Sequence, residues 1–191
     1  MAQLDSMKVE NLLAGVESPL KRQLLLLAFV SQRMKEAGSQ VPVLIGGCAL
    51  AYYSREVYFT TDIDLACADR GALDNVLCSI GFVREGRYWI HQGMNLMVEA
   101  PAASLAGEDA PRETVEMGDG LEFSVIGIED LLIDRMNACV HWNSTQECEM
   151  VDLLISMWSA EIDWQYLLAR AEKPENSTRA RFDELRKLYG S

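Results

Sequence analysis

The sequence predicts an α/β fold of the α+β kind, in which helices flank a mixed β-sheet and a helical C-terminal portion follows. Two patterns lead to this prediction. As far as residue 127, short apolar and β-branched runs typical of strands alternate with helical segments. From residue 128 onward the pattern is helical. At 191 residues the chain suits one domain, or one domain with a helical appendage, and we expect a core over 1–127 and a helical region packed on it over 128–191.

Within residues 1–127, turn residues mark where each predicted helix and strand begins and ends. Residues 19–37 predict a helix with one apolar face, ended by a Gly-Ser-Gln turn. Residues 41–45 are an apolar strand that runs into two glycines, and 47–55 form a short helix after them. An acidic strand is expected over 62–66, and a further helix over 70–80 stops at a glycine.

The later elements are two hairpins and a set of helices. Strand-like runs at 87–90 and 95–99 are joined by a Gln-Gly pair, and a Gly-Asp-Gly turn leads into the run 121–126. Between them, 101–111 is rich in Ala and Pro and is expected to be a loop. The remaining predicted helices are 129–142, 145–159, 164–171 and 176–189.

Charge narrows the class of partner. The chain has 17 basic and 29 acidic residues, a net charge of −12, which disfavours general nucleic-acid binding and favours cationic ligands. Residues 170–191 are the exception, with six basic and four acidic residues. That stretch is either a contact surface for RNA or an acidic partner, or simply a solvated helix face.

The sequence contains no pattern typical of a membrane span, a secretory signal or a paired-cysteine motif. No apolar run approaches the roughly 20 residues of a membrane span, and the N-terminus lacks the layout of a secretory signal, so we expect a cytoplasmic protein without membrane contact. The five cysteines contain no CxxC pair, and we expect them reduced and mostly buried. Cys139, His141 and Cys148 match no common zinc spacing.

Two aspartates in the acidic strand are the main candidates for chemistry. Asp62 and Asp64 are two residues apart, so in a strand their side chains share one face. Such close like charges persist most easily around a cation, and carboxylate oxygens suit Mg²⁺ or Mn²⁺. An isolated pair is usually a solvated strand end. An EF-hand loop is excluded because Cys67 stands where that loop needs glycine.

The glycine turn and a third acid complete the candidate site. Gly46 and Gly47 let backbone N–H groups approach an anion at the start of the short helix. Glu99 ends a strand-like run that we expect beside the acidic strand. It is the candidate third carboxylate of a two-metal site, either as a ligand or as the acceptor of a proton.

Four segments resemble the minimal nucleotidyltransferases of the DNA polymerase β-like superfamily, closest to small bacterial members grouped with AbiEii-type toxins and with uncharacterised nucleotidyltransferase-like proteins. They are Gly46-Gly47 before a short helix, the T-x-D-I-D-L pattern of residues 60–65, the helix start at 125–132 and the stretch 149–153. Together they span roughly residues 20 to 160. The first two are moderately specific as a pair, and the other two are supportive.

The resemblance implies a nucleotidyltransferase fold and a role for each matched residue. Asp62, Asp64 and Glu99 would be catalytic and would hold the metal. The implied nucleotide- and phosphate-binding residues are Gly46, Gly47, Cys48, Arg55, Thr60 and Thr61. The implied reaction is attack of an acceptor hydroxyl on the α-phosphate of a nucleoside triphosphate, with release of pyrophosphate.

The chain departs from the family pattern at several positions. Cys48 follows the glycines where many relatives have Ser or Thr, so the backbone would do more of the phosphate binding. Tyr58 stands where relatives often place Arg, a role that Arg55 would take over. Arg135 replaces a frequent Lys, and the third acid is more often Asp than Glu.

Several functions stay open from the sequence. The acceptor is either a small cationic antibiotic-like molecule or a tRNA or protein, as in toxin-like relatives. A homodimer or a partner protein is compatible with either. The alternative from another class is a non-catalytic, antitoxin-like interaction protein that keeps the fold. A glycosyltransferase using a D-x-D motif fits less well, because the larger nucleotide-binding half that precedes that motif is missing here.

Overall fold

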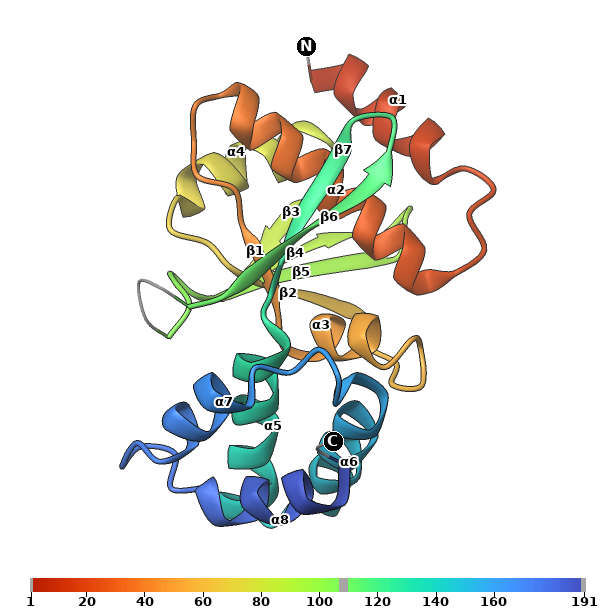
Figure 1. The fold of residues 1–191 in the computed structure, drawn as a ribbon. Helices are drawn as coiled ribbons and strands as arrows, with labels where there is room; N and C mark the ends of the chain where they lie inside the picture. The colour runs from red at the N-terminus through yellow and green to blue at the C-terminus, as the bar shows by residue number, and fades with distance from the viewer. Residues whose placement is uncertain (1, 107–109, 190–191) are drawn as a thin grey trace. The chain divides into compact units, whose positions relative to one another are not determined.

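The computed structural model describes residues 2–106 and 110–189 (Figure 1). These residues divide into two compact units. The first consists of Met1–Tyr52 with Phe59–Ile126, and the second of Tyr53–Tyr58 with Gly127–Ser191. The first unit contains the whole β-sheet, and the second is helical.

Within the described residues, the first unit is built on one seven-stranded mixed sheet, as the sequence predicts. Its order is β3-β4-β5-β2-β1-β7-β6. The strands are β1 (Val43–Ile45), β2 (Asp62–Ala66), β3 (Val83–Glu85), β4 (Tyr88–His91), β5 (Leu96–Ala102), β6 (Arg112–Gly118) and β7 (Leu121–Ile126). The pairs β1–β7 and β2–β5 are parallel, and the other neighbours are antiparallel.

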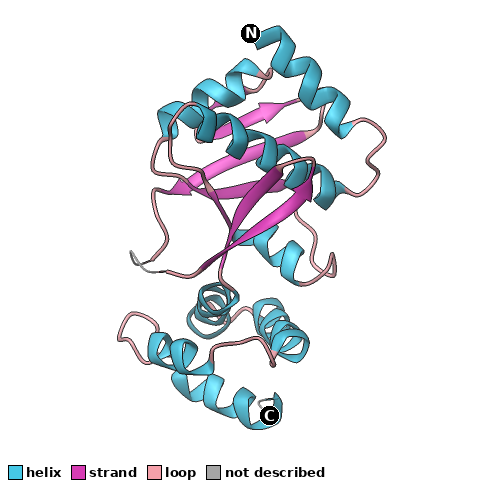
Figure 2. Cartoon of the chain, turned by 45° about the horizontal axis from the view of Figure 1, so that its top comes forward, coloured by secondary structure: helices cyan, strands magenta, loops and turns pink. Residues whose placement is uncertain are grey.

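The helices of this unit lie on both faces of the sheet. α1 (Ala2–Leu13), α2 (Pro19–Glu36) and α4 (Arg70–Ser79) cover one face, and α3 (Gly46–Tyr53) lies on the other (Figures 1 and 2). Ile63 and Leu65 of β2 are buried and line a small gap with leucines of α2. Because side chains alternate along a strand, the even-numbered residues of β2 point to the opposite face, the one that α3 shares.

Local signals explain where the predicted helices begin. Ser18 caps α2 by accepting a hydrogen bond from the Lys21 N–H, and Pro19 follows in the first turn, where its missing N–H costs nothing. Asp69 caps α4 in the same way through the Ala72 N–H. Both helices start within a residue of the expected position and confirm the prediction.

Three elements of the first unit differ from the sequence-based expectation. α1 was not predicted; it is ordered by tertiary contacts, since Val9 and Leu13 are buried. β3 was also not predicted. β5 continues through Pro101 to Ala102, inside the expected loop 101–111, of which 107–109 lie outside the described residues. The pairing of β2 and β5 shifts register before Ala102, and proline is tolerated at such irregularities.

The second unit is formed by four described helices, namely α5 (Ile128–His141), α6 (Thr145–Trp158), α7 (Trp164–Ala171) and α8 (Arg179–Tyr189). The predicted helices are confirmed, except that α8 begins at residue 179 instead of 176. Asn176 lies instead in a turn, where its N–H donates to the Lys173 carbonyl. Along the described chain, none of the helices combines the length and the apolar character that crossing a membrane requires.

The expectation that all cysteines are reduced is wrong for two of them. Cys139 and Cys148 form a disulfide with a Cα–Cα distance of 4.8 Å. The reason is local: α5 and α6 are joined by a short connection, which brings the last turn of one against the first turn of the other. Closing so short a loop stabilises the folded chain by about 3 kcal/mol in the chain-entropy treatment. Cys48 and Cys67 are free and buried, and Cys78 is free and exposed.

A buried ion pair stabilises the second unit. Arg170 Nε donates to Asp130 Oδ1 at 3.0 Å, and the Tyr166 hydroxyl donates to the other oxygen of the same carboxylate at 3.0 Å. The Asp130 side chain is 4% exposed and that of Arg170 14%. Burial, followed by the charge of Asp130, raises the pKa of Tyr166 to about 12.

We expect Asp130→Ala to lower the free energy of unfolding by about 3 kcal/mol. The substitution leaves the Arg170 guanidinium buried after its carboxylate partner is removed. Chemical denaturation of the full chain measures the effect. The control is Asp183→Ala, which removes an exposed carboxylate 3.5 Å from Arg179 Nε and should cost less than about 0.5 kcal/mol. Equal losses in the two variants would contradict the assignment.

Candidate active site

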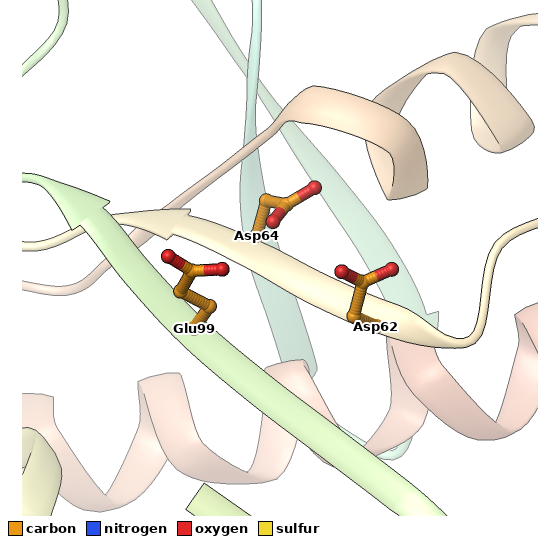
Figure 3. Close-up of side chains that lie close together, drawn as sticks. All are labelled: Asp62, Asp64 and Glu99. Carbon is orange, nitrogen blue, oxygen red and sulfur yellow. The ribbon is translucent and has the colours of Figure 1, made fainter. Parts of the chain in front are cut away.

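Asp62, Asp64 and Glu99 meet on one face of the sheet and form what we call the carboxylate cluster (Figure 3). The alternation along β2 turns both aspartates away from α2. The parallel pairing of β2 with β5 sets Asp64 directly opposite Glu99. One carboxylate oxygen from each of the three lies within 4.8 Å of the others. The aspartates are half-buried and Glu99 is buried, at 8% exposure.

The glycine turn holds the second aspartate in place. The Gly47 N–H donates to Asp64 Oδ2 at 3.0 Å. Gly46 has φ +61°, and a Cβ at this position would lie 2.3 Å from Asp64 Oδ2 and 2.8 Å from Asp64 Cβ. A side chain at residue 46 therefore collides with the carboxylate. The turn that we expected beside a phosphate also packs against a cluster residue, and its phosphate contact stays a prediction.

A chain of hydrogen bonds supports the first aspartate. The Thr60 hydroxyl donates to Asp62 Oδ1, and the Thr60 carbonyl accepts from Gln23 Nε2 at 3.1 Å. Gln23 is 3% exposed, and the Cys48 thiol donates to its Oε1 at 3.7 Å. Sequence reasoning missed Gln23. The signal in the sequence was that Gln23 directly precedes the apolar run Leu24–Val30. A polar side chain that is buried with such a run needs hydrogen-bond partners.

The Cys48 side chain is buried in the protein interior. Burial, then the charges of Asp64 and Asp62, raise the pKa of its thiol well above the usual range. The thiol therefore stays protonated and is a poor metal ligand. A contact between residue 48 and a phosphate would therefore involve the backbone, and this contact stays a prediction.

The other predicted phosphate-binding residues are distributed between the two units. Thr61 lines a pocket of about 340 Å³ in the first unit, with Phe59, Thr60 and Met94. Arg55 belongs to the second unit, where its guanidinium lies over the ring of Trp158, 5.6 Å from the centroid. The structure therefore gives Arg55 an aromatic partner, and its role toward phosphate stays a prediction.

A cation that the sequence did not predict, Arg87, lies at the cluster. Arg87 Nε is 3.3 Å from Glu99 Oε1, and the Arg87 side chain is 70% exposed. It stands in the turn between β3 and β4. No spacing rule pointed to it, because the contact depends on how that turn folds over β5.

A pocket larger than the one that Thr61 lines lies away from the cluster. It measures about 790 Å³ and lies between α2 and the β6–β7 hairpin, with Lys35, Arg112 and Glu122 in its lining. α2 covers the face of the sheet opposite the cluster. The carboxylate cluster and the groups that hydrogen-bond to it therefore define the candidate site, and this pocket does not.

The cluster suits a divalent cation by its donor set. Three carboxylates offer hard oxygen ligands, and Mg²⁺ sites typically use one or two of these with water and phosphate oxygens. The Gly47 N–H and the Thr60 hydroxyl fix two of the three side chains before any ligand binds. Asp62, Asp64 and Glu99 are thus the residues that would hold Mg²⁺ or Mn²⁺.

A solved structure resembles most of this chain. It is an antigenic nucleotidyltransferase-like protein from Paracoccidioides brasiliensis, with 18% identity and a TM-score of 0.54 over 86% of this chain and 93% of the other. This chain has a nucleotidyltransferase-like fold. The antibiotic-resistance factor ANT(2'')-Ia aligns more loosely, with a TM-score of 0.45 and 15% identity over 81% of this chain and 88% of its own.

At these identities the likeness establishes the nucleotidyltransferase-like fold alone. No protein-family model and no curated protein matches the chain. The resemblance to AbiEii-type toxins concerns a finer grouping than the fold, and it stays a prediction.

Proposed function

We propose that the protein is a metal-dependent nucleotidyltransferase, which moves a nucleoside monophosphate from a nucleoside triphosphate to a hydroxyl acceptor. The observation that carries the proposal is the carboxylate cluster beside the glycine turn, on the face of the sheet opposite α2. The nucleotidyltransferase-like fold supports it.

In the proposed reaction the acceptor oxygen forms a bond to the α-phosphorus. The bond from that phosphorus to the bridging oxygen breaks, and pyrophosphate leaves with the electron pair. Divalent cations, when bound, supply charge that stabilises the attacking and leaving oxygens. Asp62 and Asp64 would hold them, and hydrogen bonds from the Thr60 hydroxyl and the Gly47 N–H orient these two carboxylates. Glu99 either completes the ligand set or accepts the proton of the hydroxyl.

The charge distribution favours a small cationic acceptor over tRNA. The chain carries −12 overall, and a polyanion would be repelled. Two of the four basic residues of α8 are already engaged, since Arg179 donates to Glu172 and Arg181 donates to Glu184. These pairs offset the local positive charge that a docked RNA would need.

The test is incubation of the full chain with nucleoside triphosphates labelled at the α-phosphate, Mg²⁺ or Mn²⁺, and separate pools of aminoglycosides, tRNA and protein. We expect label in the aminoglycoside pool. Chelation with EDTA should lower transfer by about a hundredfold or more, and added Mn²⁺ should restore it.

Three other outcomes would change or contradict the proposal. If tRNA becomes labelled, and if this labelling falls in the Arg179→Ala and Arg181→Ala variants, the acceptor is a macromolecule instead of a small cationic molecule. Label that persists in EDTA would contradict the metal-dependent mechanism. No transfer in any pool, together with no Mn²⁺ binding, would favour the non-catalytic interaction protein.

A further inference from the structure

Arg87 is an exposed cation held against the most buried member of the carboxylate cluster. Its Nε lies 3.3 Å from Glu99 Oε1; the Arg87 side chain is 70% exposed, and that of Glu99 is 10% exposed. The guanidinium also lies over the Tyr88 ring, 4.7 Å from the centroid, and Nη2 donates to the Tyr88 hydroxyl. One end of the pair is therefore fixed in the sheet, while the other is largely in solvent.

The backbone under Arg87 sets this position. Gly86 and Arg87 form the two-residue connection between β3 and β4, and Gly86 has φ +64°, a conformation typical of tight hairpin turns. The next residue, Tyr88, pairs directly with Glu99 across β4 and β5. The hairpin thus delivers the base of the Arg87 side chain to the edge of the cluster, and the side chain is long and 70% exposed.

Electrostatics gives this arrangement two consequences. Three carboxylates within 4.8 Å repel one another, and a neighbouring guanidinium offsets part of that repulsion. A divalent ion that binds the same carboxylates competes with this contact, because like charges at short distance repel. Guanidinium groups also match phosphate oxygens in fork geometry, so a triphosphate offers the displaced side chain a new partner.

We propose that Arg87 is a positioning residue that holds Glu99 while the cluster lacks its cation, yields that carboxylate to the incoming divalent ion, and then binds the phosphates of the nucleoside triphosphate. The proposal rests on the proposed function. It assigns to Arg87 opposite effects on the two ligands: competition with the metal and attraction for the nucleotide.

The first measurement is Mn²⁺ binding without nucleotide, followed by electron paramagnetic resonance on the full chain. We expect Arg87→Ala to bind Mn²⁺ about three- to tenfold more tightly than the unaltered chain, since a competing charge is gone. Arg87→Lys keeps that charge and should stay close to the unaltered chain. The control is Arg84→Ala on the same hairpin, because Arg84 contacts Asp74 and Trp89 instead of the cluster.

The second measurement is binding of non-hydrolysable triphosphate analogues of the four ribonucleotides at saturating Mn²⁺. Here we expect Arg87→Ala to weaken binding about tenfold and Arg87→Lys to weaken it less, because lysine lacks the guanidinium fork. Arg84→Ala should match the unaltered chain. Changes of opposite sign for metal and nucleotide are the distinguishing result, because general damage to the site weakens both.

The proposal is overturned if Arg87→Ala leaves Mn²⁺ affinity unchanged or lowers it, or if nucleotide affinity does not fall. Failure of the proposed function is distinguishable from this. In that case the unaltered chain itself binds no Mn²⁺ above the level of Asp64→Asn, and both proposals are overturned together.

Discussion

Asp64→Asn is expected to lower the rate of nucleotidyl transfer by about a thousandfold. Asparagine has nearly the shape of aspartate, and its Oδ1 can still accept the Gly47 N–H that Asp64 accepts at 3.0 Å. The fold should therefore survive while one of the three negative charges of the cluster is lost. Asp62→Asn is expected to act in the same way.

Initial rates of label transfer and Mn²⁺ binding measure the effect, with a thermal melt to confirm folding. Asp69→Asn is the matched control. It removes one charge close in sequence, but it keeps the cap that Asp69 provides to α4, because asparagine caps helices as well as aspartate. Transfer within about tenfold of the unaltered chain in both cluster variants would remove the proposed chemistry.

Gly46→Ala is expected to lower the transfer rate by at least about a hundredfold. The new methyl group would lie 2.3 Å from Asp64 Oδ2, so the carboxylate must leave its position over the turn. The left-handed backbone adds roughly 1 kcal/mol of strain for a residue other than glycine. Mn²⁺ affinity should fall together with the rate.

The control separates the collision from the backbone strain. Gly38 has φ +75° and nothing within 4 Å of an added Cβ, so Gly38→Ala carries the strain without the collision. We expect it to lower stability by about 1 kcal/mol and to leave transfer unchanged. If both alanine variants lost the same activity, strain and not the collision with Asp64 would explain the result.

The parts of the site that the sequence predicted are those governed by short-range periodicity. Spacing of two residues in a strand puts Asp62 and Asp64 on one face, and an apolar run before Glu99 indicated a neighbouring strand. The structure brings the three together through β2 and β5. Their roles as metal ligands stay predictions.

The parts that the sequence did not predict depend on contacts between distant segments. Gln23 reaches Thr60 from α2, and Arg87 reaches Glu99 from a hairpin turn, and neither follows from residue spacing. The Cys139–Cys148 bridge depends on how two helices are joined. α1 has too weak an apolar pattern to be predicted without the surface that it covers.

The crowding at residue 46 also provides a marker for comparing homologues. A β-carbon there and an acid in the present rotamer at residue 64 exclude each other sterically, so the two positions are expected to vary as a linked pair. A paralogue that has acquired a side chain at the first position can be classed as a degenerate copy from its gene alone, before any assay, even where both of its aspartate codons persist.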